Sequence, residues 1–230
     1  MVLKNMYLSL AAGLLLVITL GGTVFSGEYR YRMVGQMLTT KNGRQNLFAA
    51  KIVATLIVTV LIYVIIWIFN IFLCGSIFGL EGFETNMTFI GASRFYFHAD
   101  LSDTIGGLVL RYGIVGLVVY SAVSLITIVF SSLFENELNS TILAALIFMA
   151  PALLISSFIT MFPEKMINFL RVLPPNIFQI RQTSTNAEWT WTTHQIGDLP
   201  FWLIIIIAYT AFAFIGMIFL MFRAKFLQDK

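Results

Sequence analysis

The chain has 230 residues, of which 59% are hydrophobic and only 11% carry a charged side chain. Soluble domains average about 25% charged residues, so this composition excludes an ordinary soluble domain and indicates a membrane protein. The formal net charge of +3 comes from basic residues that flank apolar stretches, which argues against a nucleic-acid-binding domain. A single cysteine, Cys74, excludes an intrachain disulfide and a cysteine-based zinc site.

Five stretches are long and apolar enough to cross a bilayer as helices, because a spanning helix needs about 20 mostly apolar residues. They do not alternate apolar with polar residues, which disfavours the strands of a membrane barrel. The predicted spans are residues 5–25, 52–79, 105–133, 140–162 and 200–222. We therefore predict an all-α integral membrane protein, a single polytopic bundle over residues 1–230 with about five transmembrane helices and short interfacial helices.

The placement of lysine and arginine predicts how these spans are oriented. The loop 27–51 carries five basic residues against one acid, Glu28, and is expected in the cytoplasm. The loop 80–104 carries four acids against Arg94 and is expected outside, together with the later segment 163–199. The N-terminus is then outside and the C-terminus inside. Residues 1–26 also resemble a signal peptide, but their apolar core is long for one.

The loop 27–51 contains an amphipathic pattern as well as charge. From Glu28 to Thr40 the apolar residues fall on one helical face, and Asn42-Gly43 is a typical helix end. The pattern predicts a short helix in the cytoplasmic interface. The simpler interpretation is a positive-inside loop that is seated among lipid headgroups. The pattern of residues 163–183 predicts a second interfacial helix, on the external side, that re-enters the headgroup zone and ends at Pro174-Pro175. An alternative role for this segment is a lid over a transport path.

A few polar residues and glycines lie inside the predicted spans. Asn70 and Tyr63, in the second span, are expected to make hydrogen bonds between helices. Gly106, Gly107, Gly113 and Gly116, in the third span, favour close helix packing, within the bundle or at a dimer interface. Arg111 lies near the external end of that span, where it could contact a substrate or extend outward towards Asp103 or Asp100.

Three motifs, in order along the chain, carry a resemblance to a known family. The first is F-S-x-E followed by Gly35, Leu38-Thr39-Thr40, Gly43-Arg44 and Lys51 in the loop 27–51. The second is the FSSLFEN turn after the third span, and the third is NFLRVLPPNIF before the last span. Together they resemble the ABC type-2 permeases, the membrane subunits of ABC exporters.

The resemblance implies that two permease subunits pair, as a homodimer or heterodimer, and that a separate ABC ATPase subunit binds beneath them with ATP and Mg. It makes segment 28–41 a coupling helix, with a second contact in the turn after the third span. It places Arg111 and Asn70 in a possible translocation path. The residues expected to touch the ATPase are Glu28, Arg30, Arg32, Met33, Met37, Leu38, Arg44 and Glu135.

This chain itself carries no G-x-x-x-x-G-K-[ST] loop, so ATP hydrolysis is expected on the partner and no catalytic or metal-binding residue is assigned here. The resemblance favours the plasma membrane of a bacterium. Its permeases usually have six spans, so it also predicts that this chain lacks the first one. A non-transporting sensor or immunity module on the same scaffold remains an alternative. An intramembrane enzyme is disfavoured, because the spans lack paired acids, histidines or Ser/Lys pairs.

Overall fold

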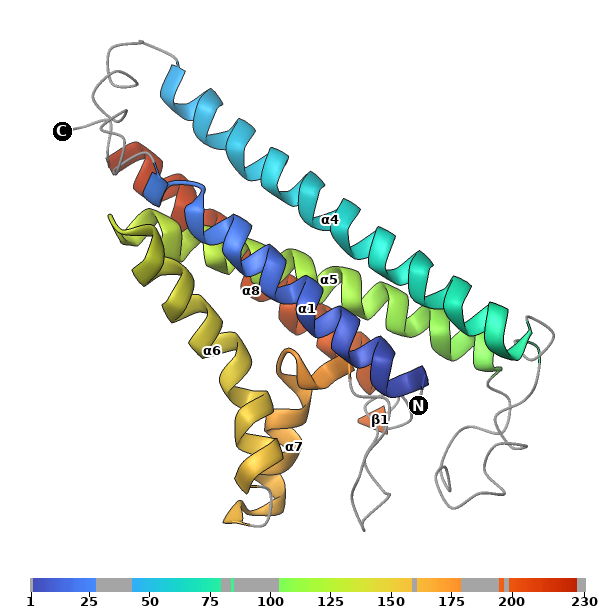
Figure 1. The fold of residues 1–230 in the computed structure, drawn as a ribbon. Coiled ribbons are helices and arrows are strands. Elements are labelled where there is room, and N and C mark those ends of the chain that lie inside the picture. The colour runs from blue at the N-terminus through green and yellow to red at the C-terminus, as the bar shows by residue number, and fades with distance from the viewer. Residues whose placement is uncertain are drawn as a thin grey trace.

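The computed structural model describes residues 2–27, 43–79, 84, 104–158, 161–178, 195–196 and 199–226. Five long helices lie side by side in one bundle (Figure 1). They are α1 (Val2–Thr23), α4 (Gly43–Phe78), α5 (Ile105–Leu133), α6 (Glu137–Phe158) and α8 (Phe201–Phe226). Between α6 and α8 come α7 (Glu164–Val172), the 3-10 helix η4 (Asn176–Phe178) and a short antiparallel pair, β1 (Gln195–Ile196) with β2 (Leu199–Pro200). The predicted all-α class is confirmed.

Four of the helices are long and apolar enough to cross a membrane, so the protein is a multi-pass membrane protein. The spanning segments are Leu47–Leu73, Val109–Leu133, Glu137–Phe158 and Trp202–Phe222. Helix α1 contributes a shorter apolar stretch, Tyr7–Thr23. The whole of α1 has 22 residues, and at about 1.5 Å per residue it extends about 33 Å, which is comparable to the thickness of the hydrocarbon core.

The helix boundaries differ from the predicted ones mainly on α4 and α6. Helix α4 begins at Gly43, which the sequence predicts as a turn residue, so it extends nine residues before the predicted span at 52. Its polar first residues project beyond the apolar segment, as expected for a helix longer than the bilayer is thick. Helix α6 begins at Glu137 and ends at Phe158, a few residues earlier at both ends than the predicted 140–162.

Successive long helices run in opposite directions (Figure 1). One end of the bundle gathers the ends of α1, α5 and α8 and the beginnings of α4 and α6, and we call it the inner end because the charge pattern predicts that it faces the cytoplasm. At this end Phe25, Ile52 and Leu220 share one buried cluster. The opposite end carries α7, η4 and the strands, and we call it the outer end.

Helix α5 is the centre of the bundle. It contacts α1, α4, α6 and α8. Of its most apolar 18-residue stretch 56% is buried inside the bundle, whereas the corresponding share is 17% for each of α4, α6 and α8. Helices α4, α6 and α8 therefore face the lipid. Large apolar side chains on them, such as Ile65 and Phe72 on α4 and Phe212 on α8, are exposed on the bundle surface. In a bilayer this exposure is favourable, because lipid tails are as apolar as the side chains.

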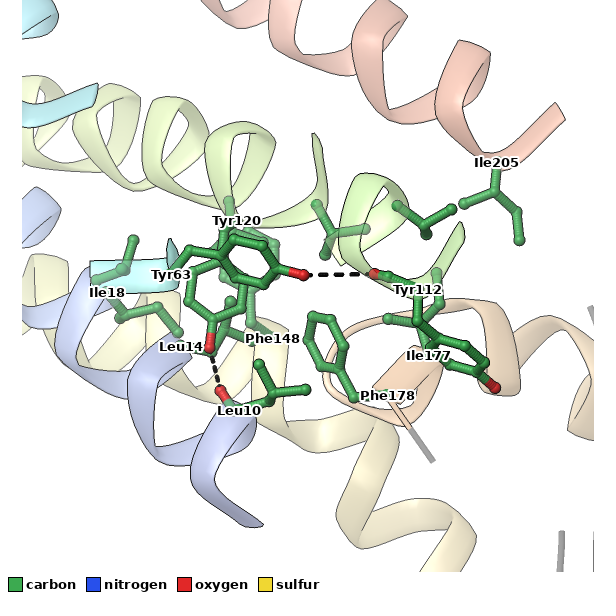
Figure 2. Close-up of a cluster of buried hydrophobic side chains, with 14 of the residues drawn as sticks. Leu10, Leu14, Ile18, Tyr63, Tyr112, Tyr120, Phe148, Ile177, Phe178 and Ile205 are labelled. Atoms are coloured by element: carbon green, nitrogen blue, oxygen red, sulfur yellow. Dashed lines mark hydrogen bonds between the residues drawn. The ribbon is translucent and has the colours of Figure 1, made fainter. Parts of the chain in front are cut away.

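The core is built around aromatic residues that fit against glycines. Figure 2 shows Tyr63 of α4 beside Tyr120 of α5, with Phe178 of η4 next to them. The Tyr63 hydroxyl donates a hydrogen bond to the Gly113 carbonyl at 2.8 Å. A Cβ atom at Gly116 would lie 2.8 Å from Tyr63 Cζ, so the ring fits only because this position has no side chain. The predicted close packing at Gly113 and Gly116 is confirmed.

The segment after α7 goes deeper than the headgroup zone that the sequence predicts for it. Ile177 and Phe178 are buried in the main core, and the Phe178 ring packs edge-on against Tyr120, which lies near the midpoint of α5. Two features make this depth acceptable in an apolar environment. Pro174 and Pro175 have no backbone N–H to satisfy. Two later N–H groups of this segment are paired, Ile177 N with Leu173 O at 3.2 Å and Phe178 N with Pro175 O at 3.0 Å.

Candidate functional site

The inner end holds the residues that flank segment 28–41, which the sequence predicts to be a partner-binding helix. Phe25, just after α1, stacks on Phe48 of α4 with 4.1 Å between ring centroids and 23° between ring planes. The Lys51 ammonium lies 5.6 Å from the centroid of the Phe25 ring, within the range of a cation–π interaction. The residues that precede and follow the segment are therefore fixed against each other.

A network of serine hydroxyls connects the end of α1 to the end of α5. The Ser131 hydroxyl, in the last turn of α5, accepts hydrogen bonds from the backbone N–H groups of Phe25 at 2.9 Å and Ser26 at 3.0 Å. It donates to the Ser26 hydroxyl at 3.3 Å, which in turn donates to the Gly22 carbonyl at 2.6 Å. Both serines are fully buried. We call this set of contacts the serine clasp.

The turn between α5 and α6 lies beside the same residues. The side-chain oxygen of Asn136 accepts from the Leu138 N–H at 3.0 Å and so caps the start of α6. Glu137 occupies the first turn of α6, where a carboxylate is favoured by the helix dipole. Its Oε1 approaches Gly27 so closely that a Cβ atom there would lie 3.1 Å away. Glu135 is exposed at this turn.

The structure places only part of the predicted coupling surface. Glu135 and the first turn of α4, which contains Arg44, lie at the same inner end. The other predicted contacts and the helix over 28–41 lie outside the described residues and stay predictions. These residues are Glu28, Arg30, Arg32, Met33, Met37 and Leu38.

Asn70 and Arg111, the predicted path residues, lie in the outer half of the bundle. The Asn70 amide donates to the Ser9 hydroxyl at 2.8 Å and accepts from it at 3.1 Å, which joins α4 to α1. The interhelical hydrogen bonds predicted for Asn70 and Tyr63 are thereby confirmed. The Arg111 guanidinium lies 5.9 Å from the centroid of the Trp202 ring on α8. Lining a path stays a prediction for both residues.

Sequence reasoning missed the serine clasp and the contact of Arg111 with Trp202, while Asp100 and Asp103, the partners predicted for Arg111, lie outside the described residues. Ser131 belongs to the FSSLFEN turn that carries the family resemblance, but nothing local in that motif indicates a contact with a residue 105 positions earlier. Trp202 does have a local signal, because it begins the last span, where tryptophan is typical of the membrane interface. In the described part of the chain, no three His, Cys, Asp or Glu residues lie close enough to hold a metal ion.

No family model matches the chain, and searches of curated proteins and of solved structures gave no match. The resemblance to ABC type-2 permeases therefore rests on the motifs alone. The fold is that of a multi-pass helical membrane bundle whose inner end is held by the serine clasp and the stacking of Phe25 on Phe48.

Proposed function

We propose that this chain is the membrane-spanning permease subunit of an ATP-driven exporter in a bacterial plasma membrane. Its ATPase partner docks on the inner end and supplies ATP and Mg. The observation that supports the proposal is that the end of α1, the start of α4 and the α5–α6 turn lie together there. A partner bound to segment 28–41 and Glu135 would act on both the α1–α4 and the α5–α6 connection at once.

The charges of the inner end suit such a partner. Arg30 and Arg32 would pair with acidic residues of the ATPase or with lipid phosphates, while the apolar stripe of segment 28–41 would pack on the partner or the bundle. A contact that transmits movement needs both faces, because charged residues guide the docking of the partner and apolar packing keeps the partner in place.

The translocation path is proposed to form between two copies of the chain or between this chain and a related subunit. The described interior of a single bundle is filled, because Tyr63, Tyr120, Phe148 and Phe178 are each at most 8% exposed. A hydrated path through one chain would require this aromatic cluster to separate. A path at a subunit boundary would leave it intact.

Co-purification tests the proposed partner. The tagged chain, extracted from its host membrane, should capture a subunit whose sequence contains a G-x-x-x-x-G-K-[ST] loop. Reversal of both charges, Arg30→Glu with Arg32→Glu, should reduce this capture about tenfold or more, since two adjacent ion pairs are turned into repulsions. Arg94→Glu, in the loop predicted to lie outside, serves as the matched control and should leave capture unchanged. Full capture by the double variant would contradict the proposal.

A non-transporting sensor or immunity module is the second candidate, and the filled interior of the single bundle favours it. The two candidates differ in liposomes that contain the chain and its captured ATPase. An exporter should move a substrate in proportion to ATP hydrolysed. A sensor or immunity module should bind the ATPase, or a substrate, without such movement.

A further inference from the structure

We propose that Ser131 is a positioning residue that makes the end of α1 and helix α5 move as one body, so that displacement of segment 28–41 reaches the centre of the bundle. The role as a relay rests on the proposed function, because the ATPase is what would displace the segment. The serine clasp itself rests only on the described contacts.

The hydrogen bonds of the serine clasp are fully matched. The Ser131 hydroxyl accepts two N–H groups and donates its one proton to Ser26, whose own proton goes to the Gly22 carbonyl. The two N–H groups, of Phe25 and Ser26, lie directly before residue 28, at the end of the described part of the α1–α4 connection. A buried N–H without an acceptor is unfavourable, and therefore this end is held to Ser131 rather than to water.

Close backbone contacts leave little slack around the clasp. A Cβ atom at Gly21 would lie 3.0 Å from Thr127 Cβ on α5, and one at Gly22 would lie 3.2 Å from Thr141 Cα on α6. Packed interiors of this density transmit displacement rather than absorb it. A movement of residues 25–27 would therefore shift the last turn of α5, and α5 contacts α1, α4, α6 and α8.

The neighbouring serine offers a matched comparison inside the same helix turn. Ser132 is also buried, but its hydroxyl donates to the Val129 carbonyl at 2.8 Å, within α5. It is the same residue type as Ser131 in the same helix turn, yet the hydrogen bond described for it joins no second element. Ser131→Ala and Ser132→Ala thus remove the same atom, and only the first opens the clasp.

Amide hydrogen exchange of the full chain in lipid nanodiscs tests the clasp. Ser131→Ala should raise the exchange rates at Phe25 and Ser26 about tenfold or more, because both N–H groups lose their acceptor. Ser132→Ala should leave these rates unchanged, and Ser131→Thr should restore them. Unchanged exchange in Ser131→Ala would overturn the proposal. If that variant does not fold, Ser131→Cys in a Cys74→Ala background replaces it, since a thiol is a weak acceptor of similar size.

The relay is tested in liposomes that contain the chain and its ATPase, by counting substrate moved per ATP hydrolysed. Ser131→Ala should lower this ratio about tenfold while ATPase capture stays at the wild-type level, with Ser132→Ala unaffected and Ser131→Thr restored. A wild-type ratio in Ser131→Ala, or loss of capture together with transport, would overturn the relay. If the wild-type chain captures no ATPase, the proposed function fails and the relay with it, while the exchange measurement still decides the clasp.

Discussion

At the scale of single residues, the bundle depends on positions where the absence of a side chain admits a ring. Gly116 admits Tyr63, and Gly13 of α1 lies where a Cβ atom would be 2.7 Å from the Tyr120 hydroxyl. Each ring then reaches a backbone carbonyl of another helix, Gly113 for Tyr63 and Leu10 for Tyr120. The glycines therefore permit hydrogen bonds as well as close contact.

Gly116→Ala should destabilise the folded protein by about 1–3 kcal/mol, because the added methyl group overlaps the Tyr63 ring. Gly216→Ala on α8 is the matched control, since its Cβ would meet only Val129 Cγ2 at 3.7 Å, an ordinary contact. Unfolding by SDS titration in mixed micelles measures both. Equal stability of the two variants would show that the Tyr63 ring is not confined by Gly116.

Asn70→Ala should cost about 0.6–2 kcal/mol of stability, the range measured for hydrogen bonds between membrane helices. A double-mutant cycle with Ser9→Ala isolates the pair, because each residue bonds to the other across α1 and α4. The two single losses should not add in the double variant. Strict additivity would mean that the pair contributes nothing to stability.

At the scale of elements, α5 differs from its neighbours in what surrounds it. Its residues pack on four other helices, whereas α4, α6 and α8 each present one broad face to lipid. The same substitution should therefore destabilise the protein more on α5 than on a helix that faces lipid. Packing, rather than a hydrophobic driving force, sets this difference in a bilayer.

Ile128→Ala on α5 should cost about 2 kcal/mol or more, since Ile128 is completely buried and its removal leaves a cavity. Ile65→Ala on α4 removes the same atoms from a side chain that is 65% exposed, where lipid can refill the space. SDS titration of the two variants compares them directly. A similar loss for both would contradict the central position of α5.

The segment after α7 is the second element with a specific consequence. In a Cys74→Ala background, Met161→Cys should react with a membrane-impermeant thiol reagent added outside the cell, because Met161 is 76% exposed at the outer end. Ile177→Cys should not react, because this position is completely buried in the core. Labelling at position 177 comparable to that at 161 would show that η4 lies outside the bundle.

At the scale of the whole molecule, the alternating direction of the long helices places each connection between them on one of the two sides of the membrane. In the same cysteine-free background, Glu135→Cys should be labelled in inverted vesicles and protected in intact cells, and Met161→Cys should show the reverse. Glu135 and Met161 are both exposed, so accessibility of the side chain itself is not limiting. The opposite labelling pattern would reverse the orientation that the lysine and arginine distribution predicts.

The sequence predicts the helical class, the close packing at Gly113 and Gly116, and the interhelical hydrogen bond of Asn70, because these follow from length, composition and residue type within one helix. It does not predict the serine clasp or the depth of η4. Ser131 meets Ser26 across 105 positions, and Phe178 meets Tyr120 across 58, so neither contact has a local signature. Residues 28–41, the centre of the functional prediction, lie outside the described structure and depend on the experiments above.

The position of α5 also has a consequence for the order in which the protein is made. Three hydrogen bonds of α5 lead to residues in or beside α1 and α4, which leave the ribosome before α5: Tyr120 donates to Leu10, Ser131 donates to Ser26, and Ser124 accepts from Thr59. These three side chains of α5 therefore find their partners already in the bilayer when α5 is inserted, whereas Trp202, which lies beside Arg111, arrives later with α8. Helices α6 and α8 arrive later and add chiefly apolar cover.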